Sequence, residues 1–102
     1  SMLRMMAEVA NADVVITNPT HYAVALKYDE QQAGAPVVLA KGKDFVALKI
    51  KEKAKENYIK MIENKPLAQA LYATVEIGQE IPPEFYAAVA EILAEIYRLK
   101  RK

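Results

Sequence analysis

The chain of 102 residues contains no cysteine and only one histidine. Without cysteine, disulfide bonds and thiolate metal sites are excluded. A single histidine cannot build a multi-histidine metal cage, so we expect no metal site. The 14 Lys and Arg residues nearly balance the 13 Asp and Glu residues, which leaves a formal charge of +1. A protein with so little net charge has no strong field for nucleic acid, which we exclude as a partner.

Catalytic groups and long apolar runs are also missing. Ser1 is the only serine, so His21 has no serine or cysteine nucleophile with which to form a triad. Gly34, Gly42 and Gly78 are isolated, and no glycine-rich loop can therefore hold a phosphate group. No apolar run approaches the roughly 18 residues that a membrane span needs. These absences predict a soluble domain that lacks the parts of an ordinary hydrolase.

The hydrophobic fraction, 53%, is enough for one small core. Ser1 and Met2 are interpreted as a cloning scar. Residues 3–11 have apolar side chains at helical spacing but begin without a capping residue, so we interpret them as the end of a linker helix from a longer protein. Residues 12–102 are predicted to form a single domain.

Four segments of this domain are typical of β-strands because they are apolar, contain β-branched or aromatic residues and end at turn residues. They are residues 13–17, 22–28, 37–40 and 58–62. The run Lys41-Gly42-Lys43 is expected to end the third strand.

Three further segments carry apolar side chains at helical spacing. Asp44 is expected to cap the first helix. The second starts at Asn64-Lys65-Pro66, with Pro66 expected as its first helical residue, and ends near Gly78. The third follows a pair of prolines, and three basic residues suit the negative C-terminal end of its dipole: Lys100, Arg101 and Lys102.

One face of each helix is expected to be buried. The inward positions are Val46, Ala47, Ile50 and Ala54 in the first helix, Leu67, Ala70, Leu71, Thr74 and Val75 in the second, and Phe85, Val89, Ile92, Leu93 and Ile96 in the third. Strands first, and then helices between and after them, predict an α/β fold with a small four-stranded mixed sheet flanked by helices.

The tetrapeptide Asn18-Pro19-Thr20-His21 joins the first two predicted strands and has unusual chemistry. An asparagine normally degrades when the next backbone nitrogen attacks its side-chain carbonyl, but Pro19 has no N–H and cannot start that reaction. The remaining route is attack by the Asn18 side-chain nitrogen on its own backbone carbonyl. That reaction forms a succinimide ring, expels the nitrogen of Pro19 and cuts the chain.

The rate of such an acyl transfer depends on how the turn holds the nucleophile near the carbonyl. Pro19 fixes its φ at about −65°, and Thr20 resists the positive φ of a type II turn, so the turn is either type I or strained. His21 can hydrogen-bond the turn or carry the proton that the leaving nitrogen needs. Asn-Pro is also a common turn opener, and on the residues alone an ordinary turn is the commoner interpretation.

Two surface patterns leave other possibilities open. Five glutamates can pair as acid and base, although glutamates on helix surfaces are usually solvated: Glu76, Glu80, Glu84, Glu91 and Glu95. The lysine-rich stretch of residues 41–65 is usually a solvated face and alternatively a docking surface for an acidic partner. Docking candidates are residues 41–55 and the apolar side chains near Tyr22 and Tyr72.

Residues 12–29, ADVVITNPTHYAVALKYD, resemble the signature of the FlhB/YscU/SpaS family, which comprises flagellar export-apparatus proteins and their relatives in virulence type III secretion. Further matches follow in order: APVVLAKG, PLAQALY, VEIGQEIP, FYAAVAEILA and YRLK. The resemblance covers almost all of the chain and is closer to the flagellar members.

The resemblance implies that the domain cleaves itself between Asn18 and Pro19, without a cofactor. Asn18 is then the cyclising residue and Pro19 the new N-terminus, while Thr20 and His21 support the turn. The two pieces are expected to stay associated, because Val14, Val15 and Ile16 are predicted core residues and a buried side chain of this size contributes roughly 1.5 to 3 kcal/mol.

The resemblance also implies a place in the cell. Family members carry a membrane part before this domain, which lies at the cytoplasmic face of the bacterial inner membrane. Cleavage is associated with a switch of export from rod and hook subunits to filament subunits. The implied partners are the export-gate membrane proteins, the exported subunits and the hook-length control protein. A docking module in which cleavage is incidental remains an alternative, and an ordinary soluble enzyme is a remote one.

Overall fold

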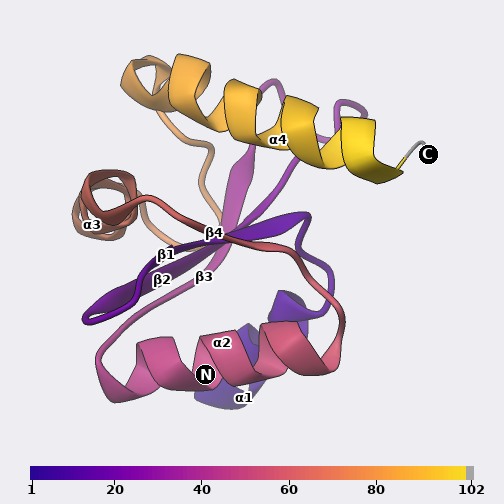
Figure 1. The fold of residues 1–102 in the computed structure, drawn as a ribbon. Coiled ribbons are helices and arrows are strands. Elements are labelled where there is room, and N and C mark those ends of the chain that lie inside the picture. Colours follow the sequence, from indigo (N-terminus) through magenta and orange to yellow (C-terminus); the bar gives the residue numbers. More distant parts are fainter. Residues whose placement is uncertain (101–102) are drawn as a thin grey trace.

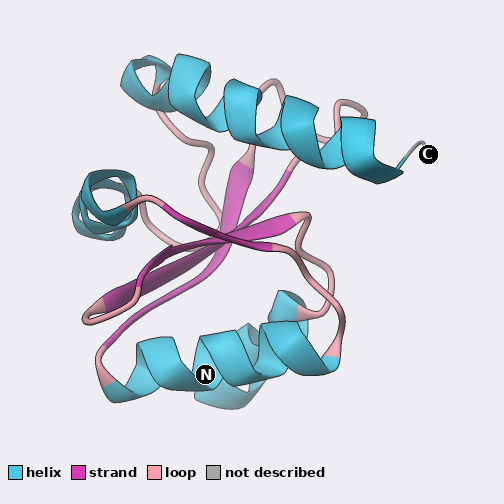
Figure 2. Ribbon diagram, viewed as in Figure 1, coloured by secondary structure: helices cyan, strands magenta, loops and turns pink. Residues whose placement is uncertain are grey.

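The computed structural model describes residues 1–100, and a four-stranded sheet with helices on both faces is its central feature (Figure 1, Figure 2). The strands are β1 (Val14–Asn18), β2 (Tyr22–Lys27), β3 (Val37–Lys43) and β4 (Met61–Glu63), in the spatial order β3-β2-β1-β4. Strand β2 is antiparallel to β1 and β3, whereas β4 is parallel to β1. The predicted mixed sheet is confirmed.

Strand β1 lies inside the sheet, and all five of its residues are buried. Successive side chains of a strand point to opposite faces. Val14 and Ile16 therefore join the core beneath α3 and α4, and Val15 joins the core that faces α1 and α2. A strand covered on both faces needs a nearly continuous apolar sequence, which explains the three apolar residues Val14, Val15 and Ile16.

Helices α1 (Met2–Val9) and α2 (Phe45–Glu56) cover one face of the sheet, and α3 (Lys65–Thr74) and α4 (Tyr86–Lys100) cover the other (Figure 1). A short 3-10 turn, η1 (Pro83–Phe85), leads into α4. The predicted inward positions are buried or half-buried except Thr74, which is exposed and donates its hydroxyl to the carbonyl of Ala70. Asn64 caps α3, because its Oδ1 accepts from the N–H of Leu67 at 3.2 Å, so Pro66 is the second helical residue and not, as predicted, the first.

Two other helix boundaries differ from the prediction. Helix α3 ends at Thr74, well before Gly78, because the β-branched Val75 takes an extended conformation. Helix α1 does have a cap, since the Ser1 hydroxyl accepts a hydrogen bond from the N–H of Arg4 at 3.4 Å.

Asp44 precedes α2, but its side chain does not cap the helix. Its backbone lies at φ 54° and ψ −115°, outside the extended conformation in which a capping side chain can turn back toward the helix. The carboxylate contacts His21 instead. The predicted cap is therefore wrong: Asp44 contacts the turn between β1 and β2 and not the first turn of α2.

Strands β3 and β4 also differ from the prediction. Strand β3 continues through Gly42 to Lys43, because a residue without a side chain lets the strand run close beneath Val46 of α2. Strand β4 is limited to three residues and begins at Met61. Tyr58, predicted as its first residue, has a positive φ of 57° and lies in the turn after α2.

The C-terminal helix α4 extends to Lys100, while Arg101 and Lys102, predicted for its end, lie outside the described residues. Within residues 1–100, no helix has both the length and the apolar character needed to cross a membrane.

The close approach of β3 and α2 gives a prediction for stability. An ideal Cβ on Gly42 would lie 2.5 Å from Val46 Cγ1 and 2.9 Å from the Val46 backbone carbon. We expect Gly42→Ala to lower the free energy of unfolding, measured by chemical denaturation, by about 1–3 kcal/mol, the usual cost of overpacking. Gly34→Ala is the matched control, since the nearest atom to its added Cβ is 3.9 Å away. Equal losses in the two variants would contradict this account.

Candidate functional site

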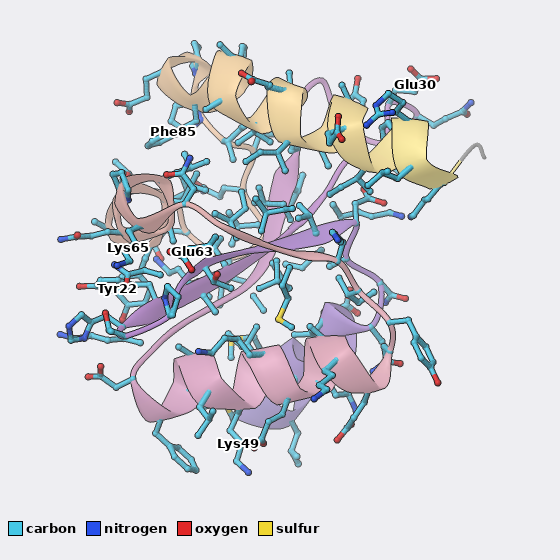
Figure 3. All side chains as sticks on the ribbon, in the orientation of Figure 1. Tyr22, Glu30, Lys49, Glu63, Lys65 and Phe85 are labelled. Atoms are coloured by element: carbon cyan, nitrogen blue, oxygen red, sulfur yellow. The ribbon has the colours of Figure 1, made fainter. Side chains whose placement is uncertain are left out.

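The four predicted site residues lie together where β1 turns into β2. Asn18 is the last residue of β1 and pairs with Tyr22, the first residue of β2, which Figure 3 labels at this end of the hairpin. The N–H of His21 donates to the carbonyl of Asn18 at 3.0 Å. Residues 18–21 therefore form a β-turn with Pro19 and Thr20 in its middle.

The Asn18 side chain is the best-fixed group of the turn. Asn18 is 7% exposed, whereas the three residues that follow it are exposed. Its Oδ1 accepts hydrogen bonds from the Thr20 N–H at 3.3 Å and from the Thr20 hydroxyl at 2.9 Å. Two donors on one oxygen fix the plane of the carboxamide and draw electron density from its nitrogen. Withdrawal of electron density makes the protons on that nitrogen easier to remove.

The backbone of the turn decides between the two predicted turn types. In the described part of the chain, the non-glycine residues with positive φ are Asp44 and Tyr58, so Thr20 does not adopt the conformation of a type II turn. Of the two predicted possibilities, a type I turn or a strained one, the structure therefore gives no sign of strain at Thr20. The strained residue nearest to the turn is Asp44, which contacts the turn from another element.

Two side chains that follow β3 hold the turn from outside. The Asp44 carboxylate lies 3.3 Å from His21 Nδ1, and the Asp44 N–H donates to the His21 carbonyl at 2.8 Å. Lys51 Nζ donates to the Pro19 carbonyl oxygen at 3.2 Å. Sequence reasoning missed both: it assigned Asp44 to a helix cap and Lys51 to a solvated face. No local pattern reveals contacts between residues 23 and 32 positions apart.

The other candidate acids and bases are arranged as surface groups. The five glutamates considered above are exposed. A hydrogen bond from Arg98 lowers the pKa of Glu95, which favours the ionised carboxylate and opposes a role as a general acid. Within residues 1–100, no three His, Asp or Glu side chains are grouped so that they can hold a metal ion.

The predicted docking residues near Tyr22 and Tyr72 contact one another. The two tyrosine rings lie 5.0 Å apart between centroids. Lys41 Nζ donates to the Tyr72 carbonyl at 2.9 Å and lies 5.2 Å from the centroid of its ring. Lys41 therefore joins β3 to α3. Docking at this surface stays a prediction.

An apolar pocket of about 290 Å³ lies between α4 and the segment that precedes β3, away from the hairpin turn. Burial raises the pKa of Tyr97 on its wall, and the charges of nearby acidic groups add to this effect. The side chains that line the pocket include Tyr28, Ala35, Pro36, Ala90, Leu93 and Tyr97. Sequence reasoning did not identify this pocket, because its wall comes from separate segments of the chain.

Solved structures share this fold. The chain superposes on the crystal structure of the cytoplasmic domain of FlhB from Shewanella putrefaciens with a TM-score of 0.94 and 48% identity, over 99% of this chain and 78% of that one. It superposes on the EscU C-terminal domain with an Asn-to-Ala substitution with a TM-score of 0.86 and 33% identity, over 90% of this chain and 92% of that one. The fold is therefore of the class found in the FlhB cytoplasmic and EscU C-terminal domains.

Sequence comparison identifies the family. The model of the "FlhB HrpN YscU SpaS Family" matches residues 1–96. Flagellar biosynthetic protein FlhB of Bacillus subtilis is 59% identical over 102 residues, which make up 100% of this chain and 28% of that protein. The chain belongs to the FlhB HrpN YscU SpaS family, as its resemblance predicted. It spans about 28% of the length of the Bacillus subtilis relative.

Proposed function

We propose that this chain is the cytoplasmic regulatory domain of a bacterial flagellar type III protein export apparatus, and that it cleaves itself once, between Asn18 and Pro19. One observation carries the proposal. The carboxamide of Asn18 is buried and fixed by Thr20 at the end of an internal strand, directly before a proline. Membership of the family and the identity with flagellar FlhB support the place of the domain in export.

The cut is an acyl transfer within Asn18. Nδ2 attacks the backbone carbonyl carbon of Asn18 and closes a five-membered succinimide, and the bond from that carbon to the Pro19 nitrogen breaks. Nδ2 gives up one proton and the Pro19 nitrogen gains one, so this step consumes neither water nor a cofactor. Water opens the succinimide afterwards.

Each turn residue has a role in this reaction. Asn18 supplies both the nucleophile and the carbonyl, and Pro19 becomes the new N-terminus. Thr20 holds and polarises the carboxamide through its two hydrogen bonds to Oδ1. His21 supports the turn, because its N–H closes it and its ring contacts Asp44.

The substitutions made in EscU support this assignment. Solved EscU C-terminal domains carry a replaced Asn, a replaced Pro directly after it and a replaced His two residues beyond that Pro. Asn18, Pro19 and His21 have the same spacing in this chain.

In the proposed function, cleavage changes the surface of the turn and switches export from rod and hook subunits to filament subunits. The partners are the membrane proteins of the export gate, the exported subunits and the hook-length control protein. The full-length protein is anchored in the bacterial inner membrane by a part that precedes this domain, which faces the cytoplasm.

The apolar pocket beneath α4 favours a second candidate function, a docking module for exported subunits in which cleavage is incidental. An apolar segment of a partner would bury its side chains there. The two functions differ in what happens when cleavage is blocked. If Asn18→Ala in the full-length protein abolishes both cleavage and the export switch, the regulatory function is supported. Normal switching without cleavage would support the docking module.

The cut itself gives a direct test on the isolated chain. We expect the purified protein to separate on a denaturing gel into residues 1–18 and residues 19–102, with Pro19 found by N-terminal sequencing. Asn18→Ala removes the nucleophile and should leave a single full-length band. Asn11→Ala is the control, since this exposed asparagine precedes Ala12 and its loss should leave the cut unchanged. A full-length band in well-folded wild-type protein would contradict self-cleavage.

The pH dependence tests the chemical route. Nδ2 becomes a better nucleophile as it loses a proton, so cleavage of newly synthesised chain should be faster at higher pH. The rate is measured from gel bands at a series of pH values within the range in which the fold is stable. A rate that is constant or falls with pH would argue against cyclisation of Asn18.

Residues 1–18 carry α1 and β1, and they should remain bound after the cut. Val14, Val15 and Ile16 are fully buried, and β1 pairs with a strand on each side. The cut protein should therefore run as one species under native conditions. Ile16→Ala should lower its stability by about 2–5 kcal/mol, measured by thermal unfolding. Ile77→Ala, at a position that is 48% exposed, should change it little. Separation of the pieces without denaturant would contradict this account.

A further inference from the structure

The two sides of the bond between Asn18 and Pro19 are held by different elements. On one side, Asn18 belongs to β1 and pairs with Tyr22 of β2. On the other side, the carbonyl of Pro19 accepts a hydrogen bond from Lys51 of α2 at 3.2 Å. Asp44, which precedes α2, holds His21 through its backbone N–H and its carboxylate, at 2.8 and 3.3 Å.

We propose that Asp44 and Lys51 are positioning residues for the cut: they hold the Pro19 side of the turn so that the Asn18 carbonyl stays within reach of its own side-chain nitrogen. This inference rests on the proposed self-cleavage. An intramolecular acyl transfer is sensitive to small changes in the position of the reacting atoms. A turn tied only by its own hydrogen bonds would leave Pro19 free to move relative to the strand.

The helix that supplies these contacts is itself fixed. Ala47, Ile50 and Ala54 of α2 are buried in the core against the sheet. Gly42 lets β3 approach this helix closely, as its contact with Val46 indicates. A side chain on such an element is placed more accurately than one on a loop.

The contacts contribute little to the stability of the fold. The side chains of His21 and Asp44 are 59% and 61% exposed, and the Lys51 hydrogen bond also lies at the surface. Ion pairs exposed to this degree add little to the free energy of folding. Their loss should therefore affect the rate of the cut much more than the stability of the domain.

Asp44 gives a sharper test because its backbone is strained. Its φ of 54° and ψ of −115° lie in a region that glycine enters readily and other residues rarely do. Strained residues of this kind collect at functional sites. Asp44→Gly relieves the strain and removes the carboxylate, so it should raise the unfolding temperature while it slows the cut. If Asp44 had a purely structural role, the unfolding temperature and the rate of the cut would not change in opposite directions.

The experiment follows the cut in chain made by cell-free synthesis, with samples quenched at intervals and separated on denaturing gels. Lys51→Met removes the donor and keeps an unbranched side chain, and it should slow the cut on the order of tenfold. Lys51→Arg restores a cationic donor and should cut at close to the wild-type rate. Lys55→Met, at an exposed position one turn further along α2, is the matched control and should cut like wild type. Unfolding temperatures are measured in an Asn18→Ala background, where every chain is intact.

The outcomes separate this inference from the proposed function. If wild type does not cut, the proposed self-cleavage itself fails. If wild type cuts in an Asn18-dependent way and both Lys51→Met and Asp44→Gly cut at the wild-type rate or faster, only the positioning role is overturned. The positioning role is also overturned, and self-cleavage stands, if Lys51→Arg cuts as slowly as Lys51→Met. Slow cutting by Lys51→Met that Lys51→Arg restores, together with a slower but more stable Asp44→Gly, supports the positioning role.

Discussion

Strand β1 has a neighbour on each side, and this constraint determines most of what the hairpin turn can do. The strand pairs with β2 and β4 and is covered by a core on each face. Its last residue, Asn18, is therefore buried and fixed in position, although the next three residues are exposed. The burial of a polar carboxamide is tolerated because Thr20 supplies two donors to its oxygen. The fold thus fixes one reacting group and leaves the rest of the turn at the surface.

The opposite side of the turn depends on a different part of the chain. Gly42 lets β3 continue close to α2, and this extension places Asp44 and Lys51 beside the turn. The positive φ of Asp44 carries a cost that the surrounding structure must offset. The carbonyl oxygen of His21 accepts a hydrogen bond from Asp44, and that of Pro19 accepts one from Lys51 of α2.

The features that could be predicted are those set by residues close together in the sequence. The β-branched run of β1 and the inward faces of α2 and α4 could be predicted, because burial on a strand or helix has a short period. The Asn-Pro-Thr-His residues could be predicted as a site because they are contiguous and their chemistry is unusual. Their assignment to a family came from a longer run of matching residues.

The predictions that failed concern features set by contacts between residues far apart in the sequence. The length of β3 depends on the space beneath Val46, which the pattern Lys-Gly-Lys does not reveal. The prediction for Asp44 used its preference for helix caps, but its contact with His21 and a positive φ prevailed. Lys51 has the composition of a solvated face, and only the fold brings it to Pro19. The pocket beneath α4 likewise exists only once its separate segments are assembled.

The pairing of β1 with a strand on each side has a mechanical consequence. The hydrogen bonds that join β1 to β2 and to β4 run across the strand direction. A pull along the chain from the N-terminal end would load these bonds together in shear instead of opening them one after another. A domain with a broken turn would thus still transmit tension from its first helix into the whole sheet.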